Sequence, residues 1–150
     1  MKPPDHHEQH LSGSLLLLLL FLSVNICSAQ YQPPVFENIS TKDGLSHSSV
    51  NYILQDHNGF MWFATYNGLN KYDGQTFKVY QRNDKDKTSI SSNDIFFIYG
   101  DISGSIWIVN SVTGLDRFDP ITETFTNFRH NPDDPESISS NELFQVTQDS

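Results

Sequence analysis

Three histidines and an acidic run are the residues of this sequence that could carry chemistry. His47 stands among Ser46, Ser48 and Ser49, which places a base beside the hydroxyls that nucleophilic catalysis uses. The stretch contains neither a Gly-x-Ser-x-Gly elbow nor a carboxylate to orient the histidine. We therefore interpret it as a polar turn that leads into a strand.

His57 and His130 are isolated, with no partner at metal-ligand spacing, and we interpret them as surface histidines. The run 84–88, Asp-Lys-Asp-Lys-Thr, begins like a calcium-binding loop. Its sixth position is Ser89 where such a loop needs glycine, and its twelfth is Ile95 where it needs glutamate. The run is therefore interpreted as a solvated acidic loop. We predict no catalytic residue, no metal site and no cofactor in this chain.

The elements that must position any site follow from a repeat, Asp-x-x-Gly-x-x-Trp and then Gly-Leu-x-x-aromatic-Asp. Matching positions of its two copies lie 45 or 46 residues apart, and the segment 45–50 in front recurs at 90–95 and 138–143. A period of this length built from strands is typical of a propeller blade. The first copy comprises Asp56, Gly59, Trp62, Gly68, Leu69 and Asp73, and the second Asp101, Gly104, Trp107, Gly114, Leu115 and Asp119.

Each part of the unit predicts a local structure. Asp-x-x-Gly favours a tight turn, in which the Asp side chain binds the backbone ahead and Gly supplies a positive φ. Asn67-Gly68 predicts a hairpin, and Thr113-Gly114 is a weaker form of the same signal. Apolar, aromatic and alternating runs predict four antiparallel strands in each copy, at 50–55, 60–65, 69–72 and 76–80, and at 95–99, 105–109, 115–118 and 124–128.

The predicted fold class is therefore all-β, with two blades and the start of a third. We divide the chain into a lead-in segment at 30–44 with a strand at 35–39, blade one at 45–82, blade two at 83–130, and a linker with the start of blade three at 131–150. Trp62 and Trp107 are expected at equivalent buried sites between blades.

Propellers close with about four to eight blades, and open sheet edges favour aggregation. We therefore expect the sequence to be the N-terminal part of a longer protein.

Residues 1–29 have the features of a secretory signal peptide. Lys2 precedes an apolar run at 15–22, and small residues end at Ala29, which predicts cleavage before Gln30. An uncleaved anchor is the alternative, although the run is short for a span of about 20 residues. Cys27 is the single cysteine and would be removed.

An exported chain that is acidic and lacks cysteine is typical of a periplasm. The net charge of -9, without a run of basic residues, argues against nucleic acid as a partner.

The unit resembles the two-component regulator propeller repeat, Asp-x-x-Gly-x-aliphatic-Trp-x-Gly-Thr-x-x-Gly-Leu-x-x-aromatic-Asp. Thr65, Tyr72 and Phe118 match it in addition to the motif residues above, and Asp-Gly-Leu-Ser-His at 43–47 resembles the usual start of such sensors. Ala64 stands where the pattern has glycine. Val-Asn-Ser-Val at 109–112 replaces its Gly-Thr pair, which predicts an altered hairpin in blade two.

The resemblance implies the periplasmic sensor of a hybrid two-component protein, with a downstream membrane span, a histidine kinase and a homodimeric full-length form. Such propellers typically sense oligosaccharides and act on transcription. The repeat residues are scaffold in this family, so no ligand-binding residue is assigned, and this part of the protein is not an enzyme.

Two alternatives to the sensor remain open. One is an exported propeller that binds carbohydrate or protein without signalling, and the other is a propeller-fold enzyme that acts on glycans. The Asp box of sialidases separates Asp and Gly by one residue, whereas two intervene in both copies here. Sugar binding without turnover would distinguish the binding protein from the enzyme.

Overall fold

The structure is a computed structural model that describes residues 33–149. The predicted signal peptide, with Cys27 and the cleavage point between Ala29 and Gln30, lies outside the described residues. The chain divides into two units, and the described part of the first, 33–37, has no regular secondary structure. Among residues 33–149, no helix is long and apolar enough to cross a membrane.

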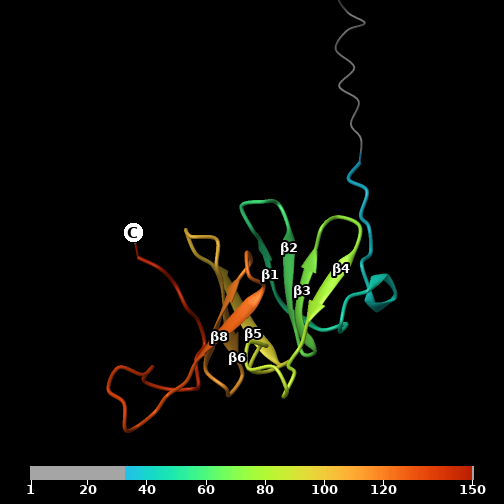
Figure 1. The fold of residues 1–150 in the computed structure, drawn as a ribbon. Coiled ribbons are helices and arrows are strands. Elements are labelled where there is room, and N and C mark those ends of the chain that lie inside the picture. The colour runs from blue at the N-terminus through green and yellow to red at the C-terminus, as the bar shows by residue number, and fades with distance from the viewer. Residues whose placement is uncertain (1–32, 150) are drawn as a thin grey trace, which may run out of the picture. The chain divides into compact units, whose positions relative to one another are not determined.

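The second unit contains two four-stranded antiparallel sheets, each with its strands in sequence order (Figure 1). Blade 1 consists of β1 (Val50–Gln55), β2 (Met61–Thr65), β3 (Gly68–Tyr72) and β4 (Phe77–Tyr80). Blade 2 consists of β5 (Ile95–Gly100), β6 (Ile106–Asn110), β7 (Leu115–Asp119) and β8 (Thr124–Phe128). Every strand lies within two residues of its predicted bounds, which confirms the all-β prediction of four-stranded blades in an unclosed ring.

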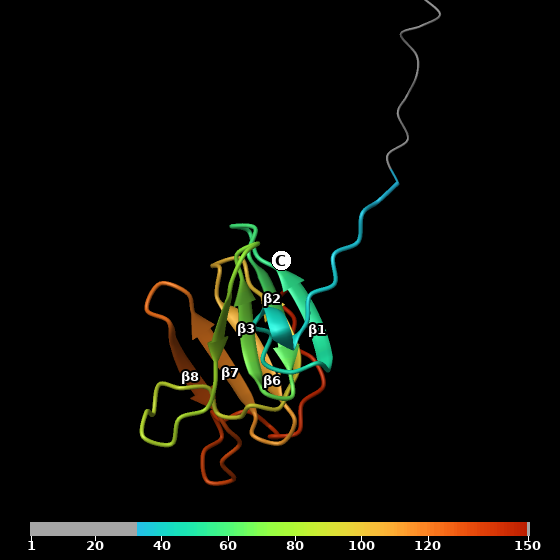
Figure 2. The ribbon, with the colours of Figure 1, turned by 90° about the vertical axis from the view of Figure 1, so that its right-hand side faces the viewer.

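The core lies between the two blades, which stack sheet on sheet (Figure 2). Alternation along β2 directs Trp62 and Ala64 toward blade 2, where β6 contributes Ile106 and Ile108, and all four are at most 1% exposed. The Trp62 ring lies 5.4 Å from the ring of Phe118, measured between centroids. Period-two alternation thus gives each strand an apolar face for its neighbouring blade.

The predicted lead-in strand at 35–39 is wrong. These residues form no strand ladder within the described part of the chain, and Val35 and Phe36 are exposed. A strand needs a neighbour for its backbone N–H and C=O groups, and an apolar alternating pattern alone does not supply one. The chain first becomes regular at the short 3-10 helix η1 (Thr41–Asp43), which Ser40 caps and which ends at Gly44 with φ 109°.

The hairpin between β2 and β3 in blade 1 differs from the hairpin between β6 and β7 in blade 2, as the departures from the repeat pattern predict. Thr65 pairs with Gly68, so the first turn is centred on residues 66 and 67, one position before the predicted Asn67-Gly68. Only the glycine has positive φ, 109°. The hairpin between β6 and β7 has a longer loop, 111–114, and Gly114 repeats the positive φ at 95°.

The third copy of the repeat begins in position but not as a strand. Residues 141–149 have no strand assignment. Even so, Gly114 N donates to Asn141 O at 3.2 Å, as Gly68 N donates to Asn93 O at 2.8 Å. The side chain of Asn141 also accepts from His130 N at 2.7 Å, as Asn93 accepts from Arg82 N at 2.7 Å. The segment around Asn141 therefore docks on blade 2 as the segment around Asn93, just before β5, docks on blade 1.

Candidate functional site

The aspartates of the repeat close the first turn of each blade and hold its tryptophan. Asp56 Oδ1 accepts from the backbone N–H groups of Asn58 and Phe60, at 2.9 and 3.0 Å. Its Oδ2 accepts from Trp62 Nε1 at 2.8 Å. Gly59, with φ 88°, completes the turn. A single carboxylate therefore organises the loop and fixes the orientation of the ring.

Blade 2 repeats this geometry. Asp101 Oδ1 accepts from Ser103 N and Ser105 N, both at 2.9 Å, and Oδ2 accepts from Trp107 Nε1 at 2.8 Å. Gly104 has φ 87°. Partial burial by itself raises the pKa of Asp101, but hydrogen bonds from the Ser103 hydroxyl, Trp107 and the backbone outweigh it and leave the pKa below its ordinary value.

The remaining motif residues also lie in turns and in the core. Asp73 accepts from Gln75 N and Thr76 N at 2.8 and 2.7 Å, and Asp119 accepts from Ile121 N at 2.8 Å. Leu69 and Leu115 are buried, and Gly68 and Gly114 begin the returning side of each hairpin. These aspartate contacts stay within the repeat and close its turns.

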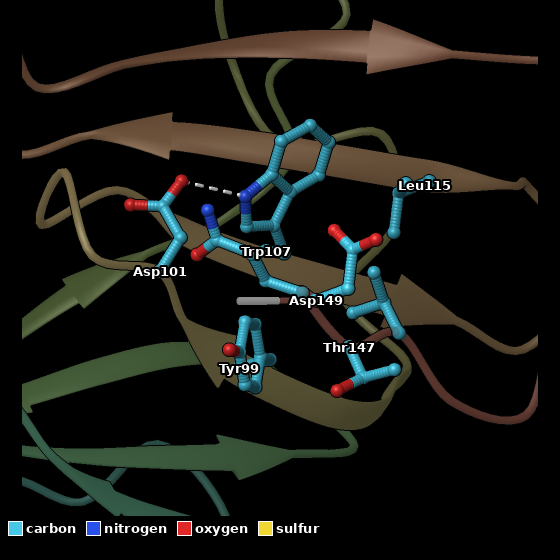
Figure 3. A pocket seen from close by; sticks show the side chains of 8 residues that line it. Tyr99, Asp101, Trp107, Leu115, Thr147 and Asp149 are labelled. Carbon is cyan, nitrogen blue, oxygen red and sulfur yellow. Dashed lines mark hydrogen bonds between the residues drawn. The ribbon is translucent and has the colours of Figure 1, made fainter.

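The two tryptophans differ in burial, which corrects the expectation of equivalent buried sites. Trp62 is 0% exposed, whereas Trp107 is half-buried and lines a groove of about 550 Å³ with Tyr99, Leu115 and residues 146–149. Figure 3 shows the Trp107 ring bonded to Asp101 on one side of the groove, with Tyr99 and Thr147 on the other. In blade 1, the Phe118 side chain of the next blade covers the corresponding ring. Around Trp107 lie the stacked ring of Phe128 at 5.6 Å, the Arg117 guanidinium at 5.9 Å and the segment 146–149.

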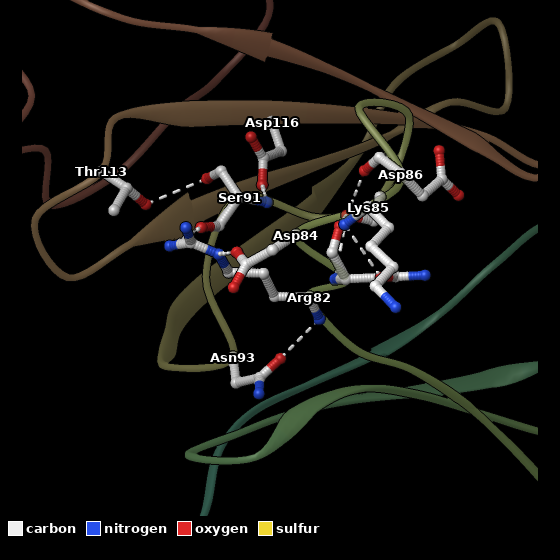
Figure 4. A network of polar contacts seen from close by, with 10 residues as sticks. Arg82, Asp84, Lys85, Asp86, Ser91, Asn93, Thr113 and Asp116 are labelled. Atoms are coloured by element: carbon white, nitrogen blue, oxygen red, sulfur yellow. Dashed lines mark hydrogen bonds and ion pairs between the residues drawn. The ribbon is translucent and has the colours of Figure 1, made fainter.

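A buried polar network beneath the linking loops was not predicted. Asp116, 0% exposed, accepts from Ser91 N at 2.9 Å, Asn110 Nδ2 at 2.9 Å and Asn127 Nδ2 at 2.7 Å. Figure 4 shows the Ser91 contact and a second hydrogen bond between the hydroxyls of Ser91 and Thr113.

Asn70 has the same place in blade 1 and accepts from Ser46 N at 2.8 Å. In each blade, a buried polar residue on the third strand thus anchors the segment that leads into the first strand. Two successive buried positions in β7, Leu115 and Asp116, break period two. Alternation alone therefore could not identify the network.

The acidic loop 84–88 lies next to this network and satisfies its own side chains. Asp86 Oδ1 accepts from the hydroxyl and the N–H of Thr88, which lowers the pKa of Asp86. Arg82 binds Asp84 at 2.8 Å and Ser91 O at 3.3 Å. Among the described residues, no group of three or more His, Cys, Asp or Glu side chains is arranged to hold a metal ion.

The histidines make local contacts. His47 Nδ1 accepts from Ser49 N at 3.0 Å, and its ring meets Tyr66 edge-on at 5.8 Å. The neighbouring hydroxyl, Ser46 Oγ, is bonded to Thr65 Oγ1 at 2.9 Å. His130 Nδ1 bonds Ile138 O at 2.8 Å. The interpretation of 46–49 as a turn leading into a strand agrees with these contacts.

Two stacked four-stranded meanders, with the same Asp and Trp contact at the same place in each, define blades of a β-propeller. The family model described as two component regulator propeller matches residues 44–67. In this stretch the chain is therefore similar to two-component regulator propellers.

Two further comparisons extend the match. Histidine kinase P4 of Formosa agariphila is 47% identical over 76 residues, which cover 51% of this chain and 6% of the kinase. The solved extracellular domain assigned to the hybrid two-component system BT3049 of B. thetaiotaomicron superposes with a TM-score of 0.71 at 35% identity, covering 77% of this chain and 16% of that one. The chain thus spans a small part of both relatives.

Proposed function

We propose that this chain is part of the periplasmic sensor of a hybrid two-component histidine kinase, and that the parent protein responds to oligosaccharides by controlling transcription. The observation that carries the proposal is the likeness, in both sequence and blade geometry, to the extracellular domain of a hybrid two-component system. The match to a histidine kinase supports the same reading. The oligosaccharide class rests on the resemblance of the repeat to sensors of that kind.

The chemistry of the described residues supports a sensor role over an enzymatic one. The carboxylates of the repeat are engaged in turns, as Asp56 and Asp101 show. The histidine with serine neighbours, His47, accepts a backbone N–H. A net charge of -9 without a basic run also supports a ligand other than nucleic acid.

The proposal is tested at the native locus. The reading frame is followed beyond codon 150 for further repeats, a membrane span and a kinase. An in-frame deletion of codons 33–149 is then compared with the wild type by measuring transcripts after feeding single oligosaccharides. We expect induction of one gene set to be lost in the deletion strain. A frame without a kinase, or induction that survives the deletion, would overturn the proposal and favour an exported binding protein or an enzyme.

A further inference from the structure

The first strand of each blade and the corresponding third segment carry no charged side chain. They read Val-Asn-Tyr-Ile-Leu-Gln in β1, Ile-Phe-Phe-Ile-Tyr-Gly in β5 and Leu-Phe-Gln-Val-Thr-Gln at 143–148. The whole chain has nine basic and 18 acidic residues. Strands β2, β6 and β8 are uncharged as well, so the absence of charge is shared with other strands of the blades. β1 and β5 are neighbours, because Asn51 Nδ2 donates to Ile95 O at 2.8 Å.

Aromatic rings on these three segments form two close pairs. The ring of Tyr52 lies 4.5 Å from that of Phe97, and the ring of Phe96 lies 6.5 Å from that of Phe144. Tyr52 is 40% exposed, Phe96 49% and Phe144 79%. We call these four side chains the inner aromatic row. Its rings lie outside the buried core between the blades.

A β-bulge lies in each first strand and accounts for the exposure of Phe96. The register with the second strand shifts between Val50 and Tyr52 in β1, and between Ile95 and Phe97 in β5. The bulged residues, Asn51 and Phe96, are unpaired in the ladder, and a bulge redirects its side chain relative to regular alternation. Phe96 is thereby kept out of the core, although its neighbours Ile95 and Ile98 are at most 1% exposed. A large apolar side chain that the backbone turns outward indicates a contact surface.

We propose that the inner aromatic row is a stacking surface for a neutral oligosaccharide. Sugar rings present apolar C–H faces that flat aromatic rings such as Tyr52 and Phe96 can cover, and hydroxyl edges that amides such as the exposed Gln145 can bind. Because these segments carry no charge, they offer no partner for the carboxylate or sulfate of an acidic glycan. The free-energy cost of removing water from that charged group would not be compensated. The ligand class rests on the proposed function, whereas the location and the neutrality come from the row itself.

Binding is measured on the full-length protein from the native locus by saturation-transfer NMR and calorimetry. The probes are neutral gluco-, manno- and xylo-hexasaccharides, with an oligogalacturonate as the acidic comparison. We expect one neutral series to bind, and Phe96→Leu to weaken its binding about 10-fold because the apolar bulk remains while the ring is lost. Phe96→Tyr should retain binding. Tyr66→Ala, at a side chain that is 54% exposed on the hairpin between β2 and β3, is the matched control and should bind as the wild type does.

The outcomes separate this inference from the proposed function. Equal affinity for Phe96→Leu and the wild type, preference for the oligogalacturonate, or no binding of any neutral hexasaccharide would overturn the stacking site. Binding that depends on Phe96 but is accompanied by no transcriptional response would leave the site standing and remove the sensor role. If the Phe96→Leu strain kept its full transcriptional response to a neutral oligosaccharide, the sensor role would stand and the stacking site would be overturned.

Discussion

The carboxylate of Asp56 accepts a hydrogen bond from the indole N–H of Trp62 at 2.8 Å while also closing the turn that precedes it. Asp101 and Trp107 repeat this relationship at the same distance in blade 2. The first turn and the core tryptophan of a blade are therefore a single structural unit. This is the physical reason that the repeat keeps Asp and Trp six residues apart.

Asp56→Ala should be strongly destabilising, because it leaves Asn58 N, Phe60 N and Trp62 Nε1 without their acceptor. We expect a loss of about 3 kcal/mol in the free energy of unfolding, since bonds to charged groups contribute about 1.5 to 3 kcal/mol. Urea denaturation measures it. Trp62→Phe removes only the indole bond and some packing, so a cost equal to that of Asp56→Ala would contradict the shared role of this carboxylate.

Truncation should distinguish the two tryptophans. Trp62→Ala empties a fully buried site between blades and should cost about 3 to 5 kcal/mol. Trp107→Ala acts at a half-buried ring beside a groove and should cost about 1 to 2 kcal/mol. Both values come from urea denaturation monitored by circular dichroism, because each variant loses one fluorophore. Equal costs would show that Trp107 is as well covered in solution as Trp62.

Two glycines with positive φ should respond differently to alanine. A Cβ on Gly68 would lie 2.5 Å from the carbonyl oxygen of Tyr80, whereas a Cβ on Gly74 would meet nothing within 4 Å. Gly74→Ala should therefore cost only the left-handed backbone penalty, about 1 kcal/mol. Gly68→Ala should cost clearly more, because β4 must also move. Thermal denaturation of the pair checks this order, and a Gly74→Ala variant that is the less stable of the two would refute it.

The Asp116 network should tolerate an amide but not an apolar side chain. Asp116→Asn keeps an acceptor for Ser91 N, as Asn70 does for Ser46 N in blade 1, and should cost about 1 kcal/mol. Asp116→Leu leaves the donors of Ser91, Asn110 and Asn127 buried without an acceptor, and should cost about 3 kcal/mol or more. Urea denaturation of both variants provides the comparison. If Asn proved as damaging as Leu, the negative charge would be the essential feature.

Acid should weaken the fold through the turn carboxylates. The N–H groups of Thr76 and Gln75 lower the pKa of Asp73, and the Ser40 hydroxyl lowers that of Asp43. Because each folded-state pKa lies below its unfolded value, this stabilisation is present above about pH 4 and is lost as the pH falls through the folded-state pKa. We expect the urea concentration at the unfolding midpoint to decrease when the pH is lowered below about 4. The Asp73→Asn variant should show a smaller decrease. A rise in stability on acidification would have the wrong sign.

The sequence alone determined the blades of this protein. Asp-x-x-Gly turns, β-branched runs and glycines recurring at one period are local signals, because they restrict the backbone of the residues that carry them. They located all eight described strands, and the departure at 109–112 predicted the longer hairpin between β6 and β7. The same signals failed at 35–39, where a pattern typical of strands has no neighbouring strand with which to pair in the described structure.

Only the tertiary structure determined how deeply individual side chains are buried and in which direction they point. Trp62 and Trp107 are identical in motif, and what differs is whether another blade lies over the ring. Asp116 is buried because the segment leading into β5 folds back onto it. Phe96 faces outward because a bulge shifts its register. These properties depend on contacts between residues distant in sequence, so a local pattern could not determine them.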